Sequence, residues 1–258
     1  MKVSTWNVNG IRARETQLLD WLLLERPDVL CLQEIKASPD QIPETLRDLP
    51  GYWGRWHGGK GYSGVSLHLR RDRFPEPTFG HPGFDHENRV VTADVGDVTF
   101  ASIYVPNGNK DYRAKIGFLE GLDAWVAAAH AGGRRLVVCG DLNVARTDRD
   151  VHPKLRKPTE IGQTDEERAL LERILARGLG DLLRHHDPDN DRLFTWWAPW
   201  RSLRERNIGW RLDYVLASTP VAERSTGCRA FREFGSSDHG PVNATFDLPA
   251  VTPPPGPA

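Results

Sequence analysis

Oxygen-bearing side chains stand where several apolar runs of the sequence stop. Asn7 ends the run Val-Ser-Thr-Trp, and Glu34 follows Val-Leu-Cys-Leu-Gln. Asp141 and Asn143 both follow Leu-Val-Val-Cys-Gly. Such runs are typical of buried strands, and carboxylates and carboxamides are hard oxygen ligands that suit Mg²⁺ or Mn²⁺. Any one of these residues could simply cap the next turn, but four together favour a cation site at strand ends.

A second polar group lies near the C-terminus. Asp238 and His239 precede the last apolar run, and Asp213 begins an earlier one. A lone histidine in a turn is usually only solvated. If Asp213 reaches His239 across the strand ends, it fixes the tautomer and favours the imidazolium, which gives a donor for a phosphoryl oxygen or a proton shuttle. Asp238 is either a further acid of this group or the cap of the turn before the last strand.

Strand-like runs and helical patterns alternate along the chain, which predicts an α/β fold. The Gly-Asp turn between two of the runs, 89–95 and 99–105, favours a hairpin and hence a mixed sheet. Thr164 and Glu167 form a capping-box pattern before a helix. Strands are predicted at Lys2–Val8, Asp28–Gln33, Ser63–Leu69, Arg89–Val95, Thr99–Val105, Arg135–Cys139, Leu212–Leu216, Gly227–Arg232 and Val242–Asp247, and helices at Gln17–Glu25, Lys115–His130 and Asp165–Arg177.

Composition bounds the organisation. With 258 residues, 39% hydrophobic and 27% charged, the chain can bury one sizeable core. We expect one catalytic domain over residues 1–248 and a disordered Pro-rich tail over residues 249–258. The formal net charge of −1 means that any nucleic acid must be held by a local basic patch. Two long polar stretches, 145–163 and 185–202, are where ligand contacts are expected.

The cysteines and the N-terminus indicate the compartment. Cys31, Cys139 and Cys228 are odd in number and far apart, so they are predicted to be reduced core residues and not disulfides or zinc ligands. The sequence shows no apolar leader and no stretch long enough to span a bilayer. We therefore expect a soluble, cytoplasmic protein without a membrane partner.

Seven motifs, running in order from residue 4 to about residue 242, carry a family resemblance. The chain resembles the exonuclease III-type apurinic/apyrimidinic (AP) endonucleases of the endonuclease/exonuclease/phosphatase superfamily. The resemblance implies a four-layer α/β sandwich, with two mixed β-sheets packed face to face and helices on the outer faces. The motifs are Thr-Trp-Asn7-Val-Asn9-Gly-Ile-Arg, Leu-Gln-Glu34-Ile-Lys36, Gly-Tyr-Ser-Gly-Val, Tyr104-Val-Pro-Asn107, Gly-Asp141-Leu-Asn143-Val-Ala, Asn-Ile-Gly-Trp210-Arg-Leu-Asp213-Tyr and Ser-Asp238-His239.

The resemblance also implies catalytic roles. Asp141 with Asn143 would orient or deprotonate the attacking water, and His239 backed by Asp213 would hold the scissile phosphate. Tyr104 would contact the phosphate or the leaving group. Each role answers the need to neutralise a phosphodiester and to align a water in line with the bond that breaks.

The same resemblance implies a metal site for Mg²⁺, with Mn²⁺ as the other candidate. Glu34 is the expected ligand, assisted by Asn7 and Asn9, and Asp238 is a further candidate. Some relatives have an aspartate where Asn9 stands. One ligand charge is therefore missing, and the sequence leaves open whether one or two ions bind.

Aromatic and basic residues account for the predicted DNA contacts. Trp196, Trp210 and Leu212 would wall an apolar pocket for a flipped-out sugar that lacks its base, although the same run also fits an ordinary core strand. Lys110 stands where some relatives have an arginine wedged into DNA. Further contacts, each of which would also suit a plain surface residue, are predicted at Arg12, Lys36, Tyr62, Asn107, Lys110 and Arg201.

These features predict a metal-dependent DNA repair hydrolase. It would cleave the phosphodiester 5′ to abasic sites and act as a 3′-5′ exonuclease and 3′-end-cleaning phosphodiesterase or phosphatase, as a monomer on double-stranded DNA. The alternatives are a superfamily phosphatase or phosphodiesterase acting on RNA or on a small phosphorylated substrate, and a nucleic-acid-binding module without catalysis. Gly-Trp-Arg-Leu-Asp-Tyr and the arginines that precede it argue against the small substrate, and the complete set of acids, amides and histidine argues against the binding module.

Overall fold

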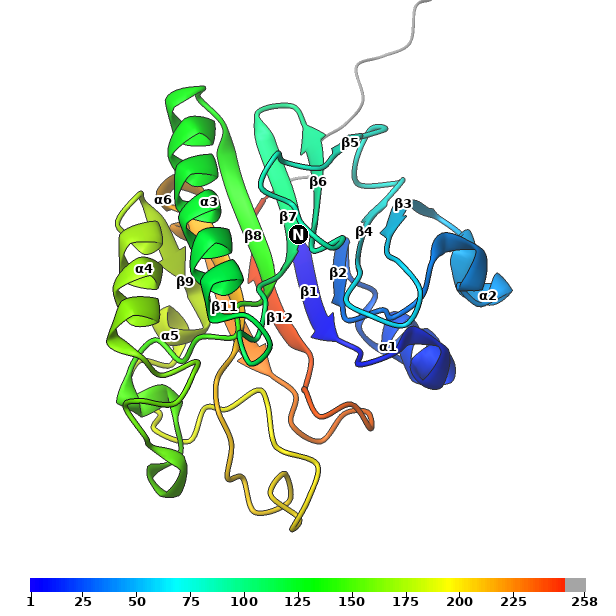
Figure 1. Ribbon diagram of the computed structural model, residues 1–258. Helices are drawn as coiled ribbons and strands as arrows, with labels where there is room; N and C mark the ends of the chain where they lie inside the picture. Colours follow the sequence, from blue (N-terminus) through cyan, green and yellow to red (C-terminus); the bar gives the residue numbers. More distant parts are fainter. Residues whose placement is uncertain (249–258) are drawn as a thin grey trace, which may run out of the picture.

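The computed structural model describes residues 1–248, in which twelve strands form two six-stranded sheets (Figure 1). The first sheet has the order β11 (Ser225–Ala230), β12 (Val242–Phe246), β1 (Lys2–Asn7), β2 (Val29–Gln33), β4 (Val65–Arg70), β3 (Tyr52–His57). The second sheet has the order β5 (Thr78–Gly80), β6 (Val90–Val95), β7 (Val98–Tyr104), β8 (Arg135–Asp141), β10 (Asp213–Ser218), β9 (Leu179–Asp181).

Both sheets are mixed, as the sequence predicts. One pair in each sheet is parallel, β1 with β2 and β7 with β8, and the other neighbours are antiparallel. The predicted hairpin is confirmed: β6 and β7 pair from Val90 opposite Ile103 to Val95 opposite Val98. Gly96 has a positive φ and supplies the left-handed conformation that this tight turn needs.

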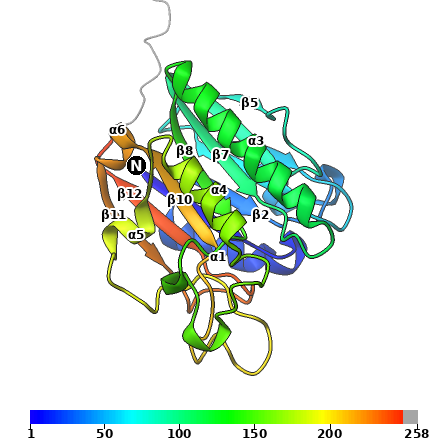
Figure 2. The same cartoon turned by 60° about the vertical axis from the view of Figure 1, so that its left-hand side comes forward.

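Helices cover the outer faces of the two sheets. On one side α1 (Glu15–Glu25) and α2 (Glu44–Arg47) pack on the first sheet, and on the other α3 (Tyr112–Ala131) and α4 (Asp165–Leu175) pack on the second. Figure 2 shows α3 and α4 side by side over their sheet. Two short helices, α5 (Leu182–His186) and α6 (Thr219–Ala222), and four 3₁₀ turns complete the fold: Ile11–Arg14, Pro39–Gln41, Asp148–Asp150 and Pro153–Leu155.

The central core lies between the two sheets. Strand residues of the first sheet, such as Val3 and Cys31, pack in one buried cluster with Phe100 and Val137 of the second. Further apolar clusters fill the space between each sheet and its helices. Continuous burial of β1, β2, β8 and β10 explains their unbroken apolar runs. The predicted four-layer sandwich is confirmed.

Several elements escape prediction for physical reasons. Each predicted strand matches an observed one to within two residues at either end, but β3, β5 and β9 were not predicted. β3 is an edge strand, nowhere fully buried, and reads Tyr-Trp-Gly-Arg-Trp-His without clear alternation. β5 and β9 are three residues long, too short to show a period. The short helices α2, α5 and α6 were missed for the same reason.

The remaining structural expectations concern cysteines, membranes and the tail. All three cysteines are free, with Cys31 and Cys139 buried and Cys228 half-buried against the central core. Among residues 1–248, no helix combines the length and the apolar character needed to cross a bilayer. The Pro-rich segment 249–258, predicted as a disordered tail, lies outside the described residues.

Candidate active site

Strand ends from both sheets meet at one edge of the sandwich. Asn7 ends β1, and Glu34 follows β2, which runs parallel to β1. Tyr104 ends β7 directly beside Asp141 at the end of β8. Asp213 begins β10, which runs antiparallel to β8, so it lies opposite Asp141. The fold thus brings to one rim residues that are far apart in the sequence.

Three polar residues at this rim lie within reach of a single ion. One ligand atom from each of Glu34, Asp141 and His239 lies within 4.8 Å of the other two. His239 lies at this rim because it precedes β12, which runs antiparallel to β1, so that the start of β12 lies beside the end of β1. The loops around residues 145–163 and 187–212 lie beyond this rim, in green and yellow at the lower end of Figure 1.

The backbone turns sharply at several of these positions. Asn9, Glu34, Lys36 and Asn143 all have a positive φ, in a left-handed conformation that non-glycine residues seldom adopt. Residues held in this way cluster at functional sites. Before Asp141, a Cβ on Gly140 would clash with the backbone oxygen of Ile103, so only glycine allows the close approach of β7 and β8 here.

Asn7 links the two carboxylates. Its Nδ2 donates hydrogen bonds of 2.9 Å to Glu34 and of 2.9 Å to Asp141, while its Oδ1 accepts the backbone N–H of Asn9. Two carboxylate acceptors require the NH₂ group on this side. Asn7 therefore presents donors, and not its oxygen, to the acid cluster.

Asn143 holds the other side of Asp141. Its backbone N–H donates to Asp141 at 2.9 Å, and its side-chain Nδ2 donates to the carbonyl of Val105 at 2.8 Å. These bonds fix the rotamer of a carboxylate that is 1% exposed.

His239 is held by an acid on each side. Its Nδ1 donates to Asp213 at 2.9 Å, and its Nε2 lies 3.7 Å from Asp141. Burial alone would lower the pKa of His239, but the charges of Asp213 and Asp141 outweigh burial and raise the pKa to about 10. At neutral pH the ring is therefore an imidazolium, and its Nε2–H faces Asp141.

The two metal-reaching carboxylates differ in charge state. Burial, reinforced by the charges of Asp213 and Glu34, raises the pKa of Asp141 to about 7, although His239 acts against this. Burial also opposes ionisation of Glu34, but hydrogen bonds from Asn7 and Lys36 outweigh it and lower the pKa. Burial and nearby carboxylates raise the pKa of the Tyr104 hydroxyl well above its usual value, so it stays protonated.

This donor set fits a divalent cation. The carboxylates of Glu34 and Asp141 converge beside the protonated His239, and the buried oxygen Oδ1 of Asp213 has no hydrogen-bond partner among the described residues. Carboxylates outnumber cationic groups in the cluster, since Lys36, 2.8 Å from Glu34, and His239 face Glu34, Asp141 and Asp213. A hard cation would balance that charge.

Asn9 and Asp238 lie beside the cluster but bond elsewhere. Asn9 donates to Asp238 at 2.7 Å and accepts from Lys36 at 2.5 Å. The other oxygen of Asp238 accepts from the indole of Trp196 at 3.0 Å. Their oxygens are thus engaged by protein donors, and a metal role for either residue stays a prediction.

The predicted apolar pocket residues do come together. Trp196 and Trp210 pack edge to face with ring centroids 5.8 Å apart, and Leu212 lies in the same cluster. Val151, from the long polar stretch 145–163, pairs with Trp210 through a β-bridge. The Trp196 ring lies 6.5 Å from that of His239, so an apolar wall stands next to the acid cluster.

The predicted basic contacts fall into two groups. Tyr62, Asn107 and Lys110 line one cavity of about 500 Å³ together with Arg89. Arg12 is exposed in the 3₁₀ turn Ile11–Arg14 after β1, and Arg201 is exposed in the 187–212 segment. Lys36 differs from both groups, because it is bound to Glu34 and Asn9 in the acid cluster itself.

Comparison with known proteins decides the family. Residues 4–239 match the model of the endonuclease/exonuclease/phosphatase family. The chain belongs to this family. It is 32% identical over 256 residues to the exodeoxyribonuclease of Bacillus subtilis, covering 96% of this chain and 100% of that protein.

Solved structures support the same assignment. An AP endonuclease from Archaeoglobus fulgidus superposes with a TM-score of 0.86 at 31% identity, covering 96% of this chain and 100% of that chain. The 3′ phosphatase NExo from Neisseria, bound to a product DNA hairpin, also gives 0.86 at 30% identity, with the same coverage. The chain is thus a metal-dependent phosphodiester hydrolase and a DNA repair nuclease.

Two buried groups that support this nuclease site were not predicted. Lys115 and Glu167 are fully buried, 2.5 Å apart, and Lys115 also donates to the carbonyl of Asn143 at 2.6 Å. Arg89 lies over the Tyr104 ring at 4.7 Å and donates to the hydroxyl of Tyr62 at 2.9 Å. The only sequence signal for Lys115 was a charge on the otherwise apolar face of a predicted helix.

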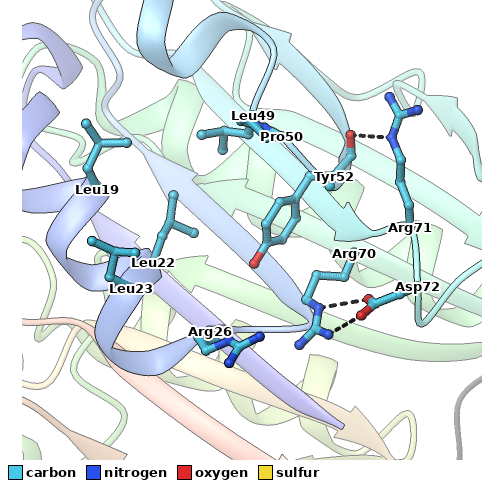
Figure 3. A pocket seen from close by; sticks show the side chains of 11 residues that line it. Leu19, Leu22, Leu23, Arg26, Leu49, Pro50, Tyr52, Arg70, Arg71 and Asp72 are labelled. Atoms are coloured by element: carbon cyan, nitrogen blue, oxygen red, sulfur yellow. Dashed lines mark hydrogen bonds and ion pairs between the residues drawn. The ribbon is translucent and has the colours of Figure 1, made fainter.

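A larger cavity of about 650 Å³ lies away from the nuclease site (Figure 3). It is lined by α1 leucines, Tyr52 and the segment Arg70–Asp72, and it contains none of the predicted site residues. Without convergent acids it offers no means of phosphodiester hydrolysis, so size alone does not locate the active site of this family member.

Proposed function

We propose that this nuclease uses Mg²⁺ to cut duplex DNA 5′ to abasic sites and to process 3′ ends, acting as a monomer through one catalytic domain of residues 1–248. The observation that carries the proposal is the convergence of Glu34, Asp141 and His239 beside the wall of Trp196 and Trp210. A hydrolytic site and an aromatic wall thus share one rim. Mn²⁺ would suit the same oxygen ligands.

Phosphodiester hydrolysis needs charge neutralisation around the phosphate. Glu34, with Asp141 nearby, would hold the cation, which when bound neutralises the phosphoryl oxygens and the leaving 3′ oxygen. His239 remains protonated because its pKa is about 10, and its Nε2–H would donate to a non-bridging oxygen. Asp213 keeps the ring in place through the bond to Nδ1.

Asp141 is the group suited to accept a proton. A carboxyl group with a pKa of about 7 can take the proton of an attacking water as the new P–O bond forms and the bond to the 3′ oxygen breaks. Asn143 would hold Asp141 for this task. The protonated Tyr104 hydroxyl would contact the phosphate or the leaving oxygen.

The aromatic wall supports a preference for sugars without a base. A nucleotide that keeps its base would have to fit that base between Trp196, Trp210 and Leu212, whereas an abasic sugar would not. The names of the two solved relatives, an AP endonuclease and a 3′ phosphatase, support both kinds of activity on DNA. Contacts to phosphates along the duplex would come from Tyr62, Asn107, Lys110, Arg12 and Arg201.

A substrate panel tests the proposal. The purified chain is given, with Mg²⁺ or with EDTA, a duplex with an internal abasic analogue, a recessed duplex with a 3′ phosphate, a structured RNA and a phosphorylated inositol lipid. We expect incision 5′ to the abasic analogue and release of the 3′ phosphate, both abolished by EDTA. Faster turnover of the RNA or the lipid than of either DNA would overturn the proposal.

A further inference from the structure

A second group of ligand-type side chains lies where the edges of the two sheets meet. His57 ends β3, the edge strand of the first sheet, and His81 follows β5, the edge strand of the second. Asp85 lies in the loop between β5 and β6. One ligand atom from each of the three lies within 4.8 Å of the other two.

This cluster is on the same rim as the nuclease site but separate from it. His57 pairs with Val65, and Val65 pairs with Gln33, the residue before Glu34. Two strand spacings amount to about 10 Å, too far for one ion to reach both groups. The residues of the cluster are therefore not used by the proposed hydrolysis.

Two of the three side chains are already oriented by contacts behind them. His81 Nδ1 lies 3.0 Å from the carbonyl of Val90, which can only accept, so Nδ1 carries the proton and Nε2 keeps its lone pair. Asp85 Oδ1 accepts the backbone N–H groups of Arg89 at 2.7 Å and of Val90 at 3.1 Å. Metal-binding imidazoles and carboxylates are typically held in this way.

The third side chain already contacts the other two. His57 Nε2 lies 2.6 Å from Asp85 Oδ2, and its ring stacks on that of His81 with centroids 3.8 Å apart. A bound ion would take the place of the proton shared by His57 and Asp85, and that proton would leave to solvent. His81 is exposed and offers one ligand atom within 4.8 Å of those of His57 and Asp85.

We propose that His57, His81 and Asp85 bind a divalent transition-metal ion of the zinc class, distinct from the cation of the nuclease site. Two imidazoles with one carboxylate suit Zn²⁺, Co²⁺ or Ni²⁺, whereas Mg²⁺ prefers all-oxygen sites. Such an ion joins the β3 edge of one sheet to the β5–β6 loop of the other. It also fixes the loop that leads into Arg89, which contacts both Tyr62 and Tyr104.

Zinc binding to the full chain tests this site. The protein is first saturated with Mg²⁺, then titrated with Zn²⁺ by calorimetry, and in parallel with Co²⁺ while the visible absorption of the bound ion is recorded. We expect His81→Ala to weaken Zn²⁺ binding at least about tenfold and to abolish the Co²⁺ band. His86→Ala, which removes an exposed histidine next to Asp85, is the matched control and should bind like the wild type.

Glu34→Gln distinguishes this site from the nuclease site. We expect Glu34→Gln to keep the Zn²⁺ binding that calorimetry detects in the wild type and that His81→Ala loses. We also expect Zn²⁺ to raise the melting temperature of the wild type and of His86→Ala but not that of His81→Ala. Loss of Zn²⁺ binding in Glu34→Gln but not in His81→Ala would overturn the proposal. So would a wild-type protein that binds no Zn²⁺ once Mg²⁺ is saturating.

Discussion

Two buried polar clusters of this nuclease are built in opposite ways. In the cluster around Asp150, the guanidinium of Arg211 donates to Asp150 at 2.7 Å and to Asp181 at 3.0 Å, and Arg184 donates to Asp150 at 2.7 Å. Arg146 lies 3.6 Å from Asp181 and also pairs with Glu172, so three carboxylates face three guanidinium groups and the charges balance. In the cluster around Asp141, carboxylates outnumber the cationic groups that contact them.

The pKa values of the two clusters reflect this difference. Burial opposes ionisation of Asp150, but Arg211 and Arg184 outweigh it and lower the pKa to about 2. Burial raises the pKa of Asp141 to about 7, because the opposing charge of His239 does not outweigh burial and the charges of Asp213 and Glu34. Both acids are 1% exposed, so burial alone does not mark a functional acid. The surplus negative charge of the Asp141 cluster does mark one, because that charge can be balanced by a metal ion and lets Asp141 accept a proton near neutral pH.

The largest expected effect is on catalysis at the unbalanced cluster. Asp141→Asn removes the proton acceptor but keeps the shape of the side chain, so we expect the turnover rate on abasic duplex to fall about 10²–10⁴-fold while DNA binding is retained. Single-turnover cleavage and fluorescence anisotropy measure the two quantities. Asp97→Asn, an exposed carboxyl paired with Arg135, is the control and should cleave like the wild type. Normal turnover of Asp141→Asn would remove Asp141 from the mechanism.

The balanced cluster should respond in stability. Arg211→Met leaves Asp150 and Asp181 buried without their shared partner, and we expect the free energy of unfolding to fall by about 3–5 kcal/mol. Urea denaturation measures this change. A loss below about 1 kcal/mol, the range of an exposed pair, would mean that the Arg211 cluster is not a structural counterpart of the catalytic one.

The two clusters should also give opposite pH dependence in the metal-free protein. The folded chain holds the Asp141 proton more tightly than the unfolded chain, so this acid's contribution to stability is full below about pH 4 and is lost as the pH rises through about 7. The contribution of Asp150 is full above about pH 4 and is lost as the pH falls through about 2. Urea midpoints measured across the pH range for the wild type should fall between about pH 4 and pH 7, and this fall should disappear in Asp141→Asn. If the fall is unchanged in that variant, another group causes it.

The smallest effect should come from an ion pair outside both clusters. Arg113 and Glu166 lie 3.8 Å apart with side-chain exposures of 85% and 50%. Because solvent screens such a pair, we expect Arg113→Ala to change the free energy of unfolding by less than about 0.5 kcal/mol in the same urea assay. A change as large as that of Arg211→Met would show that the pairing of charges, and not their burial, determines how far the free energy of unfolding falls.

The sequence predicts the central strands and the long helices well, because their residues are buried in a regular pattern. Val29–Gln33 is buried throughout and α4 has a complete capping box, so both follow directly from residue order. The edge strand β3 carries no such pattern, so nothing in the sequence singles out His57 at its end. What the sequence could not predict is the pairing of distant edges, which brings His57 to Asp85.

The site was predictable in its members and less so in their contacts. Polar residues after buried runs pointed to Glu34 and Asp141, because parallel strands must end at one rim. That Asn7 presents its amide hydrogens, and that Asn9 bonds to Asp238, depends on rotamers fixed by tertiary packing. Lys115 likewise reaches the site only through its hydrogen bond to the carbonyl of Asn143, a residue 28 positions further along the chain.

The most direct test of the unbalanced cluster is the affinity of the metal-free protein for Mg²⁺, measured by calorimetry for the wild type, Glu34→Gln and the Asp97→Asn control. If Glu34 and its neighbours hold surplus negative charge for a cation, Glu34→Gln should bind Mg²⁺ at least about tenfold more weakly, and Asp97→Asn should bind it like the wild type. Equal Mg²⁺ affinity in all three proteins would contradict the account.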